Sequence, residues 1–518
     1  MKKILQAIVV PSILFACASC NDFLDTMPDN RTELNTPEKI SKVLVDAYPT
    51  ANWNMLAEFS SDNTDDNGSR NMELDRLSEE VYHWKDTKES GNDSPGAYWE
   101  ACYKAVAVSN HALEAIEKLG DTEDLKAQKG EALLCRAYGH FMLSYIFCNA
   151  WTASNQNTAL GIPYSTKPET TVNPSYERGT IGQTYEKIAK DIEEGLALVD
   201  DNNYSVPKYH FNRKAAYAFA ARVYLYYGKY ERAIECANVV LGDNASLVLR
   251  DWEALGKLSL NEDHQPNAYI SSTEQANLLL VTSRSFWGLY NGPLTTSNRY
   301  CHNPTIAETE TCSSTGVWGD CTSTLKQQPA DYTSIPKVVF RKFPLYYMEY
   351  TDPVLGNGYY NIISSAFNTD ETLLVRAEAY ALTKQYSKAI ADMQSWLNAY
   401  TTSKVQLTEE NINQFYGNIA YYTPTEPTVK KKLHPDFALE AGTQENLIQF
   451  ILHARRITTL HEGLRWGDIK RYGITIYRRI IEDKEITVTD ELKADDPRRA
   501  IQLPADVILA GLEANPRS

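Results

Sequence analysis

Two segments far apart in the chain share one spacing of aromatic and small residues, and this spacing constrains the fold more than any other feature. In residues 212–241, Tyr224 is followed six positions later by Tyr230 and three positions after that by Ala233. Residues 373–400 repeat both intervals. Small residues let two helices approach closely, and aromatic rings fill the space beside them. Each segment is therefore predicted to form two packed helices.

This arrangement resembles a tetratricopeptide repeat, in which each unit is a pair of helices. Helical periodicity also appears in residues 98–119, 129–151 and 184–198. Residues 242–370 differ, because they are rich in Ser, Thr, Asn, Gly and Pro and show little periodicity. We expect a mainly α fold of tetratricopeptide-like helix pairs, interrupted by long irregular insertions. Loops of this length are usually functional or disordered, and the Trp and Tyr content argues against disorder.

The overall composition is that of a globular protein. The chain has 518 residues, a formal net charge of −16 and 23% charged residues, and its mean hydropathy is −0.42. These values exclude an integral membrane protein and a disordered chain. The negative charge argues against a nucleic-acid partner, which requires a concentrated basic surface.

The first twenty residues read as a secretory signal. Lys2 and Lys3 precede an apolar stretch that is too short to span a bilayer, and two small residues then precede Cys20. A Cys in this context resembles the bacterial lipobox, in which the Cys is acylated and becomes the first residue. We expect residues 1–19 to be the signal peptide and Cys20 to carry the lipid, with an unlipidated signal peptide as the alternative. Removal of the two lysines makes the net charge −18.

The remaining seven cysteines fall into two groups. Four lie in helical patterns and are expected to be small buried residues, namely Cys102, Cys135, Cys148 and Cys236. The other three lie in the irregular region, where an exported protein could form one disulfide, and the sequence leaves this open for Cys301, Cys312 and Cys321.

Motifs along nearly the whole chain resemble the SusD/RagB family of Bacteroidetes outer-membrane lipoproteins. They are CNDFLDTMPDN at residues 20–30, YWEACYKAVAVSN at 98–110, GIPY at 161–164 and LHARRITTLHEGLRWGDIKRYG at 452–473. The last of these is the most specific. It departs from the family at Ala454 and Thr459, where acidic residues are usual.

The resemblance implies one SusD-like domain over residues 20–518. Its parts are an N-terminal region of helix pairs (20–245), a ligand-facing insertion (242–370), a further helix pair (371–400) and a C-terminal segment (401–518). It also implies a protein on the outer membrane, facing the exterior, that captures an oligosaccharide for a SusC-like TonB-dependent transporter and performs no chemistry. The alternatives are a peptide-binding RagB-like lid and a secreted glycan hydrolase.

Two motifs are better explained by structure than by catalysis or metal binding. Arg455, Arg456 and Arg465 are expected to form ion pairs with Glu462 and Asp468 that attach the C-terminal helix to the rest. His461-Glu462 begins like a zincin motif, but Arg465 stands where the second His belongs. No metal or other cofactor is therefore expected, with calcium as the alternative in residues 62–68. That loop has Leu74 where a calcium loop has Glu.

The best candidates for the ligand site are aromatic residues outside the helical patterns. A flat ring with a polar edge matches both the apolar face and the hydroxyl rim of a sugar. Neighbouring glycines are expected to let the rings stand out from the surface. In the family the acidic loop lies near the ligand, where carboxylates can bind hydroxyl groups. The predicted site residues are Trp84, Trp287, Tyr290, Trp318, Asp65 and Asp66, with Tyr300 as a further aromatic candidate.

Overall fold

The computed structural model describes residues 33–73, 75–170, 175–260, 263–292, 298–332, 335–483 and 485–517. The predicted signal peptide and Cys20 lie outside these ranges. Within the described ranges, no helix is long and apolar enough to cross a bilayer.

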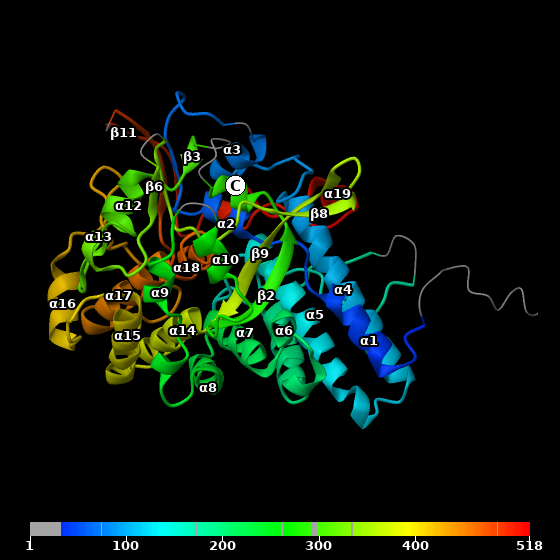
Figure 1. Cartoon of the computed structure of the whole chain (residues 1–518). Helices are drawn as coiled ribbons and strands as arrows, with labels where there is room; N and C mark the ends of the chain where they lie inside the picture. Colours follow the sequence, from blue (N-terminus) through cyan, green and yellow to red (C-terminus); the bar gives the residue numbers. More distant parts are fainter. Residues whose placement is uncertain are drawn as a thin grey trace, which may run out of the picture.

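The helices run through the whole chain (Figure 1). Their bounds are α1 Pro37–Leu44, α2 Asn54–Ser60, α3 Arg76–Tyr82, α4 Pro95–Lys118, α5 Lys126–Phe147, α6 Ile181–Leu196, α7 Arg213–Tyr226, α8 Tyr230–Leu241, α9 Trp252–Gly256, α10 His264–Tyr269, α11 Trp287–Tyr290, α12 Pro304–Glu310, α13 Cys321–Thr324, α14 Thr369–Leu382, α15 Tyr386–Tyr400, α16 Glu409–Asn418, α17 Thr443–Thr458, α18 Arg465–Arg471 and α19 Ala505–Leu509.

The described strands are two or three residues long except for β2, β8, β9, β10 and β11, which have 6 to 12 residues. Their bounds are β1 Asp65–Asp66, β2 Asn277–Arg284, β3 Tyr300–Cys301, β4 Thr315–Gly316, β5 Gly319–Asp320, β6 Ala330–Tyr332, β7 Lys337–Val339, β8 Tyr347–Asp352, β9 Asn357–Asn368, β10 Ile476–Glu482 and β11 Glu485–Leu492. One sheet has the order β2-β9-β8 and another the order β11-β10-β1-β3.

The predicted helix pairs are present. α7 packs on α8, α8 on α14, and α14 on both α15 and α17. α7 begins where the Asn212 side chain accepts a hydrogen bond from the backbone N–H of Ala215 (3.0 Å). It ends at a turn in which Gly228 has φ of +68°, after which α8 starts. The mainly α fold expected from the spacing is confirmed.

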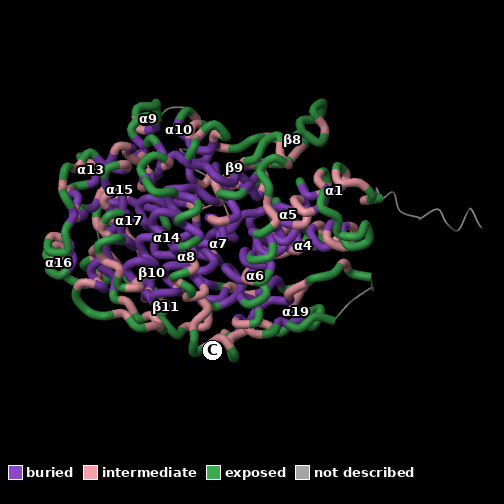
Figure 2. Tube along the Cα trace, turned by 90° about the horizontal axis from the view of Figure 1, so that it is seen from below, coloured by how far each residue is buried: buried purple, intermediate pink, exposed green. Residues whose placement is uncertain are grey.

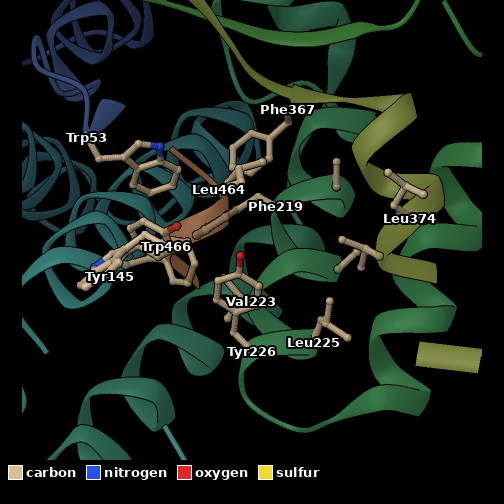
Figure 3. Packing of buried hydrophobic residues seen from close by; sticks show 14 of the residues in the cluster. Trp53, Tyr145, Phe219, Val223, Leu225, Tyr226, Phe367, Leu374, Leu464 and Trp466 are labelled. Carbon is tan, nitrogen blue, oxygen red and sulfur yellow. The ribbon is translucent and has the colours of Figure 1, made fainter. Parts of the chain in front are cut away.

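The main core lies where these helices meet the N-terminal segment and α18. Figure 3 shows Trp53, Tyr145, Phe219, Tyr226 and Trp466 gathered there. The rings of Trp53 and Tyr145 have centroids 4.3 Å apart. Buried residues fill the interior along the helices, and exposed ones form the outer layer (Figure 2).

Residues 242–370 contain more regular structure than the sequence indicates. They hold the β2-β9-β8 sheet and several short helices. The 12-residue strand β9 escapes pattern analysis because its burial does not alternate regularly along its length. The structure also answers the question that the sequence left open about the cysteines. All seven described cysteines are buried free thiols, so Cys301, Cys312 and Cys321 form no disulfide.

Buried ion pairs tie the arginine-rich motif to the rest of the protein, but their partners differ from the predicted ones except for Asp468 with Arg455. Arg465 forms a two-point contact with Asp62 (2.8 and 2.9 Å). Arg456 pairs with Glu310 (2.9 Å), and Arg455 pairs with Asp468 (2.9 Å). Glu462 differs from the prediction, because it accepts the Tyr269 hydroxyl (2.5 Å) and lies 3.6 Å from Lys342.

Asp62 pairs with three cations of this network, as does Glu310. Burial alone raises the pKa of its carboxyl, but Arg456, Arg465 and Lys431 together hold that pKa well below its ordinary value. The folded state therefore gains stability from ionised Asp62 at neutral pH and loses it as acid titrates the group.

We predict that Asp62→Asn lowers the free energy of unfolding by about 3–5 kcal/mol, because it leaves buried cations without their partner. Denaturant unfolding at neutral pH measures the loss. The matched control is Glu440→Gln, which removes only the exposed pair with Lys384 and should leave stability unchanged. Equal effects of the two variants would contradict the role assigned to Asp62.

Candidate functional site

A cluster of partly exposed aromatic rings lies on the β8–β9 hairpin and at its base. We call Phe286, Tyr346, Tyr350 and Tyr360 the aromatic face. The rings of Tyr346 and Tyr360 meet edge to face, with centroids 4.7 Å apart. Phe286 lies 5.4 Å from Tyr360 on its other side. Tyr346 and Tyr350 are 44% and 57% exposed, so their rings are available to a ligand.

Strand register explains why these rings share one side. Met348 is paired with Tyr360, and Tyr350 is paired with Gly358. Directly opposed residues in an antiparallel pair point to the same face, and alternate residues along a strand do so too. Gly358 is required here, because a Cβ at this position would lie 2.1 Å from the carbonyl oxygen of Glu349. The space opposite Tyr350 therefore holds no side chain.

The other side of the hairpin is also aromatic but carries a charge. The guanidinium of Arg284 lies 3.6 Å from the centroid of Tyr359. The Tyr347 hydroxyl donates to Asn267 on α10 (2.7 Å), which holds the base of the hairpin against the body. The hairpin loop projects from the body in Figures 1 and 2, and its tip exposes Val354 and Leu355.

The best-formed cavities between the described residues are small. Four cavities among the described residues have volumes of about 10 to 40 Å³. Since one water needs roughly 10–15 Å³, they have room for a few waters and not for a sugar ring. None of these four cavities can hold an oligosaccharide, whereas exposed flat rings with polar edges suit one.

Trp287 and Tyr290 are brought together, but facing inward. Trp287 is 4% exposed and its Nε1 donates to the carbonyl of His461 (2.9 Å). Tyr290 is half-buried and its hydroxyl donates to Asp75. Both rings meet the edge of Phe59. Together with Tyr300 they line a cavity of about 20 Å³.

Trp84 and Trp318 lie apart from that pair and from each other. Trp84 is 7% exposed and its ring contacts the guanidinium of Arg478 (3.9 Å). Trp318 is 1% exposed and packs against Trp396, with centroids 5.0 Å apart. The expectation that neighbouring glycines let the predicted rings stand out from the surface is wrong for Trp287 and Trp318. The Gly316 backbone instead lies against Trp318, where a Cβ would meet the ring at 2.4 Å.

The two predicted carboxylates are already occupied. Asp65 makes a two-point contact with Arg479 (3.0 and 2.6 Å). Asp66 makes one with Arg299 (2.9 Å for both bonds). In the described part of the chain, no group of three or more His, Cys, Asp or Glu side chains is arranged to hold a metal ion. The acidic side chains that a calcium ion would need in residues 62–68 are therefore already bound to arginine.

Ligand contact at Trp84, Trp287, Tyr290, Trp318, Asp65 and Asp66 stays a prediction, and the burial and internal bonds of most of these side chains favour packing. The aromatic face itself was missed by the sequence reasoning. Its signal was present as two Tyr-Tyr doublets, residues 346–347 and 359–360, on either side of Gly356. The doublets lie on either side of a glycine-containing turn, which is typical of a hairpin.

Comparisons with known proteins agree with the fold. Residues 22–225 match a SusD-like family described as "Starch-binding associating with outer membrane". SusD-like protein P2 of Formosa agariphila is 26% identical over 167 residues, which is 31% of this chain and 29% of that protein. The matched region therefore spans under a third of that relative.

Solved structures align over almost the whole chain. A SusD superfamily protein of Bacteroides thetaiotaomicron is 19% identical, with a TM-score of 0.64 over 93% of this chain and 100% of that one. A SusD-like carbohydrate binding protein of Bacteroides vulgatus is 15% identical, with a TM-score of 0.62 over 92% and 96%. At these identities the likeness shows the fold.

We predict that Trp318→Ala lowers the free energy of unfolding by about 3–5 kcal/mol, because it leaves a cavity among Trp396, Phe450 and His453. Denaturant unfolding measures the loss. Val354→Ala on the exposed tip is the control and should have no effect on stability. A stable Trp318→Ala protein that has lost glycan binding would restore Trp318 to the ligand site.

Proposed function

We propose that this chain is a SusD-like protein, a cell-surface lipoprotein that binds a glycan on the aromatic face. The observation that carries the proposal is the exposure of Tyr346 and Tyr350 beside Tyr360 and Phe286 on a projecting hairpin. The family description, which names starch binding and the outer membrane, supports the ligand class and the location.

Binding would combine stacking with hydrogen bonds. A sugar ring can lie against Tyr350, where Gly358 leaves the opposite strand position free of a side chain. The tyrosine hydroxyl groups can then bond the hydroxyl rim. No side chain of the aromatic face is charged, which suits a neutral glycan better than a polyanion. We propose that the bound oligosaccharide is then delivered to a SusC-like TonB-dependent transporter, with no chemical step on this chain.

Two other functions remain as alternatives. A peptide-binding lid would use main-chain hydrogen bonds, and β8 is an edge strand that could supply them. Calorimetric titration with neutral oligosaccharides and with peptide mixtures separates this from glycan binding. A glycan hydrolase would release reducing ends from a bound polysaccharide, and an assay for them tests that alternative.

We predict that Tyr350→Ala and Tyr360→Ala each weaken binding of a neutral oligosaccharide about tenfold, because each removes a stacking surface. Titration with maltoheptaose, cellohexaose, xylohexaose and mannohexaose measures the change. Tyr421→Ala is the matched control, since Tyr421 is an exposed tyrosine bonded to Glu445 away from the hairpin. Unchanged affinity in both hairpin variants, or binding of peptides alone, would contradict the proposal.

We predict that Cys20→Ala releases the protein from the membrane fraction, because Cys20 is the proposed site of acylation and lipid chains are what hold such a protein on a bilayer. Fractionation and mass spectrometry of the N-terminal peptide measure this. Cys17→Ala is the control and should stay in the membrane fraction. A Cys20→Ala protein that remains there with a lipidated peptide would place the anchor elsewhere.

A further inference from the structure

A buried aspartate lies directly behind the aromatic face. Asp93 is 3% exposed and lies between α3 and α4, far in sequence from the hairpin. One carboxylate oxygen accepts the Ser285 hydroxyl (2.5 Å), and the other accepts the backbone N–H of Phe286 (2.8 Å). Both partners belong to the two residues that follow β2, at the base of the hairpin.

These two bonds fix the backbone that carries Phe286. The Ser285 hydroxyl also accepts the N–H of Trp287 (3.0 Å), and the Ser285 N–H donates to the carbonyl of Tyr360 (3.1 Å). Asp93 therefore connects to two members of the aromatic face, one through its main chain and one through the neighbouring residue. Phe286 in turn contacts the Tyr360 ring.

The position of Asp93 carries strain and an isolated charge. Its φ is +65°, in the left-handed region that residues other than glycine rarely adopt. Among the described residues no cation forms an ion pair with it, and the charged group that acts on it is Asp75 at the start of α3, of the same sign. A buried, strained and unpaired carboxylate lowers stability, and such groups gather at functional sites.

We propose that Asp93 is a positioning residue for ligand binding, which holds Phe286 in the place where it completes the aromatic face. This rests on the proposed function, since it assigns Asp93 a role in glycan binding. The ionised carboxylate accepts two hydrogen bonds, and charge-assisted bonds are roughly twice as strong as neutral ones. Protonation converts one oxygen into a donor and weakens this hold.

Acid should therefore weaken glycan binding. Burial raises the pKa of Asp93 to about 6, with a smaller contribution from Asp75, while the bonds from Ser285 and Phe286 oppose the rise. Because this pKa is raised, the charge itself lowers stability as the pH rises through 6. The form that binds ligand best is thus the less stable form, and affinity falls as the pH drops below about 6.

The first test removes the carboxylate without adding backbone strain. Asp93→Gly keeps a residue that accepts φ of +65°, and it should lower the affinity for the best-binding oligosaccharide of the four named above about tenfold. Asp93→Asn retains one acceptor and should restore part of the affinity. The control is Asp121→Gly, since Asp121 also has positive φ. It lies past the far end of the 24-residue helix α4, roughly 36 Å away at 1.5 Å per residue.

The second test asks whether Asp93 acts through Phe286. In a Phe286→Ala background, Asp93→Gly should have little further effect on affinity. An equal loss in both backgrounds would overturn the proposal. In the wild type the affinity should fall two- to threefold between pH 7 and pH 5, and Asp93→Asn should remove this dependence. A pH profile that is the same in both proteins would also overturn it.

A third measurement needs no ligand. Amide hydrogen exchange in the peptide that contains Phe286 should speed up in Asp93→Gly, while the peptide at the hairpin tip stays unchanged. If none of the oligosaccharides binds, the proposed function fails while exchange still tests the positioning of Phe286. Exchange that is unchanged at Phe286 would overturn the assignment of Asp93.

Discussion

The structure depends on a three-residue turn between α17 and α18, at which segments from across the chain converge. The carbonyls of His461, Glu462 and Gly463 each accept a hydrogen bond from a different aromatic side chain. The donors are Trp287 (2.9 Å), Trp53 (2.9 Å) and the Tyr145 hydroxyl (2.6 Å). A buried turn cannot leave its main-chain groups unpaired, so these three rings belong to the support of the turn.

The same turn is fixed by backbone geometry and charge. His461 and Gly463 both have φ near +75°. A Cβ at position 463 would lie 2.7 Å from the Trp53 ring, so only glycine fits. The Gly463 N–H donates to the carboxylate of Glu58 on α2 (2.7 Å). Ion pairs on either side of the turn, from Arg456 and Arg465 to Asp62, then join α17 and α18 to the segment that follows α2. This convergence explains why the C-terminal motif is so specific.

The sequence predicts the helix pairs well and the ligand site poorly, for one physical reason. Helix packing depends on residues a few positions apart, so the spacing around Tyr224 and Tyr230 is enough to predict the helix pair. Whether an aromatic residue in a loop is buried or exposed depends on contacts with residues far along the chain. Trp287 is buried because a carbonyl 174 residues away accepts its N–H. Tyr350 is exposed because its opposite residue is glycine. The neighbouring residues indicate a hairpin around Tyr350, but they do not show which of the two rings becomes buried.

The distribution of charge follows from the same convergence. Asp62, Asp65 and Glu310 are buried, and each is paired with arginine, so they add little to the field outside the protein. The negative net charge therefore acts mainly from the exposed acids, and it opposes a polyanion at long range. On the hairpin the aromatic face has no charged member, and Arg284 lies on the opposite side against Tyr359. A neutral ligand would thus meet neither a desolvation penalty from a charged group on that face nor repulsion on approach.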